Sequence, residues 1–166
     1  MLAALLSVQR GYDTYVVDLV AEGPKPGMVR RLGASYYQVG DLGEAAFEAD
    51  VIIECTGFVQ RLLEVGPQHA RQRIMCLTGV SSAGENLGVD PGLLNRNMVL
   101  HNSVLFGSVN ANRDHYELGA KALAGADPRW LAGLIARQVP LGQWADAYTR
   151  RPDDIKTVLT FPGQSP

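Results

Sequence analysis

The sequence predicts an α/β fold centred on a parallel β-sheet, and three observations support this prediction. The apolar run Val51–Glu54 is rich in β-branched residues and leads to Thr56-Gly57, a pattern typical of a strand buried on both faces of a parallel sheet. A second apolar run, Arg73–Thr78, also ends at a glycine. A helical pattern over Met1–Arg10 precedes a strand pattern over Tyr15–Asp18, and such alternation of helices and strands is typical of α/β proteins.

The composition is that of an ordinary globular protein with about one domain's worth of core. Of the 166 residues, 46% are hydrophobic and 19% are charged. The net charge of −2 gives no reason to expect nucleic acid or an anionic membrane as a partner. Both cysteines, Cys55 and Cys76, lie in or beside apolar runs. They are expected to be buried free thiols in a reducing compartment, which predicts a cytoplasmic protein.

The first residues read as a helix that the chain enters without a cap. Leu2, Leu5 and Leu6 share one face of this helix, and Gly11 fits the position just past its end. A signal peptide is the alternative, but no basic segment precedes the apolar residues and no small-residue cleavage site follows them. We therefore expect the chain to be the later part of a longer protein.

Asp18 is the first candidate binding residue, because it ends a strand that follows a helix. This order is that of the second half of a βαβ dinucleotide unit, where the acidic side chain accepts hydrogen bonds from the adenosine ribose and repels a 2′-phosphate. A solvated turn aspartate is the alternative. The Gly-rich turn of such a unit would precede Met1. The predicted fold is therefore α/β: an incomplete doubly wound (Rossmann-like) parallel sheet, followed by C-terminal helices and a strand.

The second candidate region is the rim formed by the loops that follow the two buried strands. In open parallel sheets, ligands bind beyond the carboxyl ends of the strands. Thr56 and Gly57 end one strand, and the small, polar stretch Gly79–Gly84 follows the other. A shared ligand is one interpretation of this repeated Thr-Gly ending. The alternative is that threonine and glycine are simply common in turns.

The other elements follow from local patterns. Gly23–Gly27 contains two prolines and is expected to be a loop. Asp90 and Pro91 fit the N-cap and first residue of a helix that runs to about Asn97. Ile155–Phe161 alternates apolar and polar residues and is expected to be a strand at the edge of a different sheet. Further helical segments are expected at Met28–Leu32, Asp41–Ala49, Val59–Ala70, Asp114–Leu123, Arg129–Val139 and Leu141–Arg150, and further strands at Ser35–Val39 and Val104–Ser108.

Taken together, the chain resembles the C-terminal, cofactor-binding part of zinc-dependent medium-chain glucose 1-dehydrogenases. The segments that carry the resemblance are Tyr15–Asp18, Asp50–Gly57, Leu77–Ser82, Asn97–Glu117, Val139–Leu141 and Arg151–Phe161. The stretch Asn97–Glu117 is the specific one, since the strands alone would fit almost any nucleotide-binding fold. The resemblance implies oxidation of glucose or a related aldose at C1 to the lactone, with hydride transfer to NAD or NADP.

The resemblance also implies which residues bind. The cofactor would contact Asp18, Leu19 and Val20 at the ribose, Gly79, Val80 and Ser81 along its length, and Val109, Asn110 and Ala111 near the nicotinamide. Thr56 and Gly57 join this cofactor-binding set because of their place at the rim. Asn110 would also bind the sugar substrate, because an amide offers both donors and acceptors to hydroxyls. Asp18 favours NAD, whereas Lys25, Arg30 and Arg31 leave NADP open.

No residue of this chain is expected to be catalytic or to bind a metal. The family's zinc ligands lie in an N-terminal catalytic domain, and nothing here matches them. His101 and His115 are expected to be solvated or core residues rather than a metal pair.

The expected organisation is an incomplete dinucleotide-binding domain at residues 1–113, followed by a C-terminal helical segment and return strand at 114–166. By analogy the full-length protein is a homo-oligomer. The isolated chain is expected to be poorly stable, because its sheet would have an open edge. Two alternatives stay open: a noncatalytic NAD(H)-binding sensor module, and an alcohol or polyol dehydrogenase of the same superfamily.

Overall fold

The computed structural model describes residues 1–43, 48–58, 74–81, 88 and 90–163. The chain divides into two compact units. One combines Met1–Asp41 with Arg113–Pro166, and the other is Leu42–Asn112. The predicted helix Val59–Ala70 lies outside the described residues, and the predicted boundary at residue 113 between a nucleotide domain and a C-terminal segment stays a prediction. Within the described part, no helix combines the length and the apolar character that a membrane span requires.

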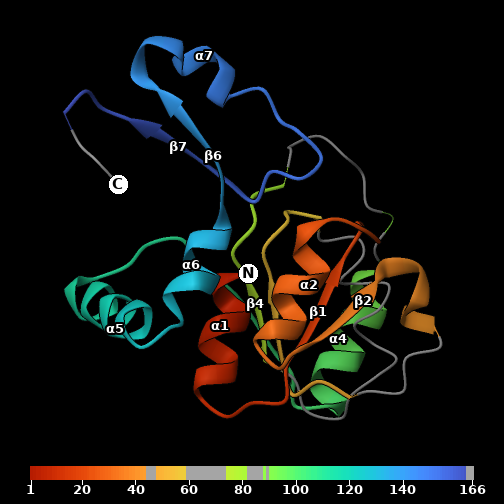
Figure 1. Cartoon of the computed structure of the whole chain (residues 1–166). Helices are drawn as coiled ribbons and strands as arrows, with labels where there is room; N and C mark the ends of the chain where they lie inside the picture. Colours follow the sequence, from red (N-terminus) through yellow and green to blue (C-terminus); the bar gives the residue numbers. More distant parts are fainter. Residues whose placement is uncertain (44–47, 59–73, 82–87, 89, 164–166) are drawn as a thin grey trace. The chain divides into compact units, whose positions relative to one another are not determined.

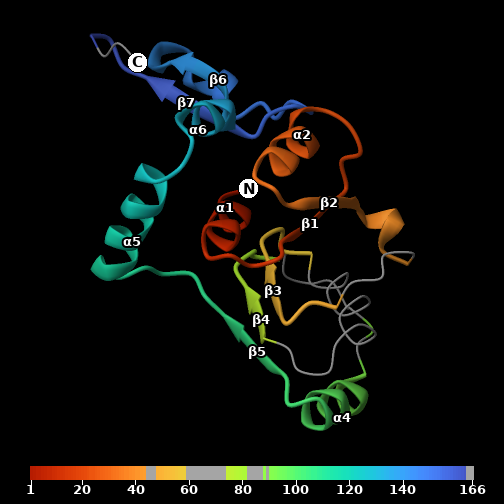
Figure 2. The same cartoon turned by 60° about the horizontal axis from the view of Figure 1, so that its bottom comes forward.

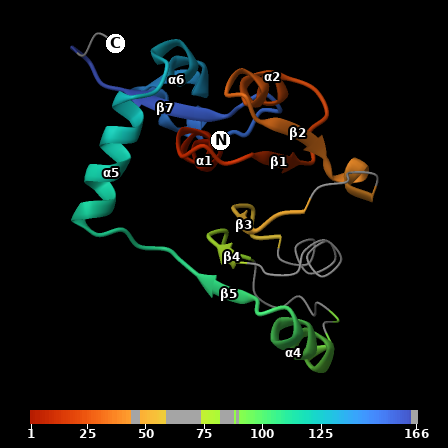
Figure 3. The same ribbon diagram turned by 90° about the horizontal axis from the view of Figure 1, so that it is seen from below.

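The first unit begins with a helix that is followed by a short β-α-β arrangement. Helix α1 (Leu2–Gln9) precedes strand β1 (Tyr15–Asp18), helix α2 (Pro24–Arg31) and strand β2 (Ser35–Gln38). The two strands pair in parallel, with Tyr15 opposite Ser35 and Asp18 opposite Gln38. Figure 3 shows α2 beside this pair of strands. The predictions of α1, β1 and β2 are confirmed.

The start of α2 corrects the predicted proline loop. The helix begins at Pro24, inside the segment Gly23–Gly27 that was expected to be irregular. Proline is tolerated in the first turn of a helix, because the backbone N–H groups there have no intrahelical partner to lose. The segment Met28–Leu32 is therefore the later part of a longer helix rather than an isolated turn.

The core of the first unit joins residues that are far apart in the sequence. Leu5, Met28, Trp130 and Leu134 form one buried cluster. Met28 is 1% exposed, and the indole Nε1 of Trp130 donates a hydrogen bond of 2.8 Å to its carbonyl oxygen. Trp130 and Leu134 belong to helix α6 (Pro128–Leu134). In this cluster, α6 therefore packs against α1 and α2.

The C-terminal segment differs most from the prediction. After helix α5 (Arg113–Ala124) and α6, the chain turns into strand β6 (Ile135–Pro140), so the predicted helix Arg129–Val139 is wrong beyond Leu134. β-Branched Ile135 and Val139 favour extended backbone, and Val139 is only 4% exposed. The predicted helix Leu141–Arg150 is reduced to the 3₁₀ turn η3 (Leu141–Gln143) and helix α7 (Trp144–Ala147).

Strand β7 (Lys156–Thr160) confirms the predicted strand near the end of the chain. It pairs in parallel with β6 and forms a separate two-stranded sheet, as the alternation of its residues indicated. Helix α7 lies against these two strands (Figure 1).

The second unit holds a three-stranded parallel sheet, and each of its strands was predicted from the sequence. Its strands are β3 (Val51–Glu54), β4 (Ile74–Leu77) and β5 (Val104–Gly107), in that order across the sheet. They lie side by side in Figure 2. Glu54 is opposite Leu77, and Leu77 is opposite Gly107, so the carboxyl ends of all three strands meet at one edge.

Helix α4 (Pro91–Leu100) has the predicted N-cap. The Oδ1 atom of Asp90 accepts hydrogen bonds from the backbone N–H groups of Gly92 at 2.8 Å and Leu93 at 3.1 Å. Asp41, the first residue of the predicted helix Asp41–Ala49, lies in the 3₁₀ turn η1 (Val39–Gly43). Residues 44–47 of that predicted helix lie outside the described part.

Two burial predictions are wrong. In β3, Val51 is 53% exposed and Ile53 is 43% exposed, whereas Glu54 on the other face is 8% exposed. The face of the strand that bears Val51 and Ile53 is thus more exposed than the face that bears Glu54. Cys55 follows β3 and is exposed, because the strand ends one residue before it. Cys76 is half-buried, and both thiols are free as expected.

Candidate functional site

Asp18 lies at the carboxyl end of β1, where its carboxylate is held by two groups. The Nζ atom of Lys25 is 2.9 Å from Oδ2, and the backbone N–H of Leu19 donates to Oδ1 at 2.7 Å. Partial burial raises the pKa of this carboxyl, but the Lys25 ammonium and the backbone N–H groups of Leu19 and Val20 outweigh burial and lower the pKa below its usual value. Asp18 is therefore an anion at neutral pH.

The two residues after Asp18 are positioned by side chains of the neighbouring strand. The Tyr36 hydroxyl donates to the carbonyl oxygen of Val20, and Nε2 of Gln38 donates to that of Leu19 at 3.2 Å. Burial raises the pKa of Tyr36, so its hydroxyl stays protonated as a donor. Local sequence patterns did not identify Tyr36 and Gln38 as site residues. The signal that could have found them is the parallel pairing of the two strands.

Glu54 occupies the corresponding place at the end of β3. Glu54 is 8% exposed, and among the described residues it is the one charged residue that is buried. The carboxylate accepts hydrogen bonds from the backbone N–H and hydroxyl of Thr56, and from the backbone N–H of Gly57 at 3.0 and 3.1 Å. Burial raises the pKa of Glu54, but these hydrogen bonds outweigh it and lower the pKa below its usual value.

The loops after β3 and β4 meet through their glycines. A Cβ atom on Gly79 would lie 2.0 Å from the backbone nitrogen of Gly57, and a Cβ atom on Gly57 would lie 2.5 Å from the carbonyl oxygen of Val80. Gly57 also has a φ of 79°, which few other residues adopt. The Ser81 hydroxyl donates to the Gly57 carbonyl oxygen. The structure thus brings together the predicted rim residues Thr56, Gly57, Gly79, Val80 and Ser81.

The third predicted segment follows β5 in the same unit. The backbone N–H of Ser108 donates to the Leu77 carbonyl oxygen at 2.9 Å, which continues the sheet to the edge where the rim loops begin. Val109, Asn110 and Ala111 come next; all three are exposed, and Val109 is 85% exposed. The roles of this segment and of the rim and ribose residues stay predictions.

No group of three or more histidine, cysteine, aspartate or glutamate residues that could hold a metal ion occurs in the described ranges. His101 is half-buried after α4, and His115 is exposed on α5. The described residues therefore do not offer a zinc site.

Two features, one in each compact unit, bear on a dinucleotide. In one unit the loops after β3 and β4 meet through their glycines, and in the other Asp18 supplies an anionic acceptor at the end of a parallel strand. These are the features with which α/β folds bind ribose and pyrophosphate.

Comparison with known proteins gives a consistent result. The family described as "Glucose dehydrogenase C-terminus" matches residues 1–161. "Glucose 1-dehydrogenase 1" of Caldivirga maquilingensis is 38% identical over 152 residues, which are 88% of this chain and 42% of that protein. "Glucose 1-dehydrogenase 2" of Vulcanisaeta moutnovskia is 36% identical over 81% of this chain and 39% of its own length. The chain thus spans about two-fifths of the length of these relatives.

Solved structures agree with the fold. The glucose dehydrogenase of Haloferax mediterranei, determined in complex with NADP, Zn and gluconolactone, superposes with a TM-score of 0.82 at 29% identity, over 97% of this chain and 47% of that one. An alcohol dehydrogenase of Thermotoga maritima superposes with a TM-score of 0.79 at 18% identity, over 95% of this chain and 46% of that one, which shows likeness of fold alone. The predicted α/β, Rossmann-like class is confirmed.

Proposed function

Because the chain belongs to the glucose dehydrogenase C-terminus family, we propose that it is the nucleotide-binding part of an oxidoreductase that oxidises glucose or a related aldose at C1 to the lactone. The names of the relatives support this proposal, and so does the gluconolactone bound to the Haloferax enzyme. The observation that carries it is the ionised Asp18 at the carboxyl end of a parallel strand, in a turn fixed by β2.

In this proposal, NAD or NADP takes up the hydride removed from the sugar. Asp18 accepts hydrogen bonds from the ribose hydroxyls, and the backbone of Leu19 and Val20 lines the same turn. The glycines let the loops after β3 and β4 pack against each other, with Ser81 bonded to Gly57, and the cofactor lies along these loops. In the segment after β5, Asn110 positions the sugar through its amide.

The proposed cofactor preference is for NAD, since an anionic Asp18 repels a 2′-phosphate. Lys25 opposes this preference, because its ammonium lies 2.9 Å from the Asp18 carboxylate. No group of three or more histidine, cysteine, aspartate or glutamate side chains that could hold zinc is found in the described part of the chain. We propose that zinc binds in a part of the protein that this chain does not include.

The direct test is a titration of the purified chain with NADH and NADPH, in which binding is measured by energy transfer from the tryptophans of the chain. Saturable binding is expected, and Asp18→Ala should weaken NADH binding about tenfold, the loss expected for one hydrogen bond to a charged group. Absence of any binding would overturn the proposal. Glucose and NAD added to the chain alone should give no NADH, because the described residues hold no metal site.

A test of the substrate class requires a protein that is longer than this chain. We suggest joining the chain to the N-terminal half of the Haloferax enzyme and assaying glucose, other aldoses, ethanol and butanediol. Lactone formation from glucose supports the proposal. A chimera that oxidises only the simple alcohols would instead identify an alcohol or polyol dehydrogenase.

A further inference from the structure

We propose that Glu54 is a positioning residue, which fixes the two loops that face the cofactor without touching the cofactor itself. This inference rests on the proposed function of the same site and adds a residue to it. Its basis is that Glu54 binds both loops at once, one through its side chain and the other through its main chain.

The side chain of Glu54 holds the loop after β3. Among the described residues, the groups that stabilise the carboxylate all come from residues 56–58, namely the Thr56 hydroxyl and a run of backbone N–H groups. A carboxylate that accepts several successive N–H groups fixes the direction of each one. The loop conformation that gives Gly57 its positive φ is therefore tied to this side chain.

The main chain of Glu54 holds the loop after β4. Its carbonyl oxygen accepts hydrogen bonds from the Thr78 backbone N–H at 2.8 Å, the Thr78 hydroxyl at 2.8 Å and the Gly79 backbone N–H at 3.2 Å. The side chain also reaches this loop, since a Cβ atom on Gly79 would lie 2.7 Å from Oε2. Both loops are therefore bound by the same residue, Glu54.

The position of Glu54 separates this role from ordinary stabilisation of a core. A charged group in a core is costly and is usually replaceable by an apolar one. Here the donors lie only at the carboxyl edge of the sheet, where ligands of such folds bind, and an apolar side chain would leave them unpaired. Glutamate at this site is explained by the shape that it imposes on the loops.

Two substitutions test the inference with different strengths. Glu54→Ala removes every acceptor of the side chain, so the turn at Thr56 and Gly57 loses its anchor. Glu54→Gln keeps one oxygen, which can still accept from Thr56, but places an amide N–H₂ near the Gly57 donor. We expect NADH affinity to fall at least tenfold in Glu54→Ala and to recover partly in Glu54→Gln.

The measurements are NADH titration and amide hydrogen exchange of the free chain. Glu54→Ala should speed exchange at the Thr56, Gly57 and Gly79 amides, and Glu48→Ala, which alters an exposed glutamate of the same unit, should change neither readout. Met75→Ala is the control for stability, because Met75 is 7% exposed in β4 and makes no part of either loop.

The outcomes separate the two proposals. If the unmodified chain binds no nucleotide, the proposed function fails. If the chain binds NADH and Glu54→Ala leaves loop exchange or NADH affinity unchanged, the positioning role is overturned. It is also overturned if Met75→Ala weakens NADH binding as much as Glu54→Ala does at an equal loss of melting temperature.

Discussion

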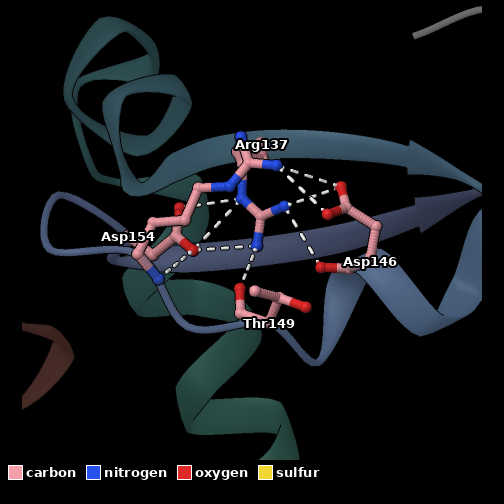
Figure 4. A network of polar contacts seen from close by, with 5 residues as sticks. Arg137, Asp146, Thr149 and Asp154 are labelled. Atoms are coloured by element: carbon pink, nitrogen blue, oxygen red, sulfur yellow. Dashed lines mark hydrogen bonds and ion pairs between the residues drawn. The ribbon is translucent and has the colours of Figure 1, made fainter.

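Arg137 in β6 binds the carboxylate of Asp154, in the turn before β7, through its Nε and Nη2 atoms. Its Nε atom lies 2.9 and 3.1 Å from the two carboxylate oxygens, and Nη2 lies 2.9 Å from Oδ2. The same guanidinium reaches the carboxylate of Asp146 at 3.1 Å and the carbonyl oxygen of Thr149 at 2.8 Å (Figure 4). One arginine thus ties together β6, α7 and the start of β7.

Arg137→Met should lower the melting temperature of the chain by more than about 5 °C, because it takes the guanidinium away from the Asp154 carboxylate and the Thr149 carbonyl. Asp154 would keep the hydrogen bond from the Arg151 backbone N–H, at 3.1 Å. The side chains of Arg137 and Asp154 are only 12% and 13% exposed. The control is Arg151→Met, whose pair with Asp146 is 52% and 45% exposed and should contribute little. Circular dichroism melts compare the two variants, and equal effects would contradict the assigned importance of Arg137.

The same pair predicts how stability depends on pH. Hydrogen bonds from Arg137 lower the pKa of Asp154 below its usual value, against the opposing effect of burial. A carboxyl with a lowered folded-state pKa stabilises the fold above its unfolded pKa of about 3.9, and this stabilisation is lost as the pH falls through the lower, folded value. Asp154→Asn should therefore melt below the parent chain at neutral pH, and the gap should close under strongly acidic conditions. A gap that widened as the pH fell would be inconsistent with this sign.

Lys25 and Asp18 should set the balance between the two nicotinamide cofactors in opposite directions. Asp18→Asn removes the negative charge that repels a 2′-phosphate, so the NADPH-to-NADH ratio of dissociation constants should fall about tenfold. Lys25→Met leaves the Asp18 charge without its partner at 2.9 Å, so the same ratio should rise. Lys156→Met, an exposed lysine of β7, is the control and should leave the ratio unchanged. If Lys25→Met affected both cofactors equally, Lys25 would have no part in the choice.

Local patterns were sufficient for the elements whose signals lie within a few residues. Short apolar runs predicted β3, β4 and β5, and the Asp90-Pro91 pair predicted the start of α4. Prolines misled at α2, because the same residue that interrupts a helix is acceptable in its first turn. At β6, the apolar spacing that suggested a longer helix also suits a strand, and its pairing with β7 decides the outcome.

The candidate site was predictable only in part, for the same reason. Asp18, Thr56 and Gly79 were predicted as site residues because each comes at or just after the end of a strand. The groups that hold them were not, because Tyr36, Gln38 and the Glu54 carboxylate act across strand pairings or turns that sequence spacing does not reveal. An acidic residue that ends a strand two positions before Thr56 was an available signal for Glu54, since Asp18 also ends its strand.

The contact between the two rim glycines gives the sharpest test of the site. Gly79→Ala should separate the loops, because the new Cβ atom would lie 2.0 Å from the Gly57 nitrogen and 2.7 Å from Oε2 of Glu54, and backbone atoms cannot yield as a flexible side chain does. We expect at least a tenfold loss of NADH affinity, measured by titration.

The matched control is Gly107→Ala in β5. Among the described residues, a Cβ atom there meets the Leu77 carbonyl oxygen alone, at an ordinary contact distance of 3.9 Å. This variant should bind NADH as the parent chain does. If Gly79→Ala kept full affinity while Gly107→Ala lost it, the cofactor would not depend on the loops after β3 and β4, and the ligand contacts would have to be sought near β5 instead.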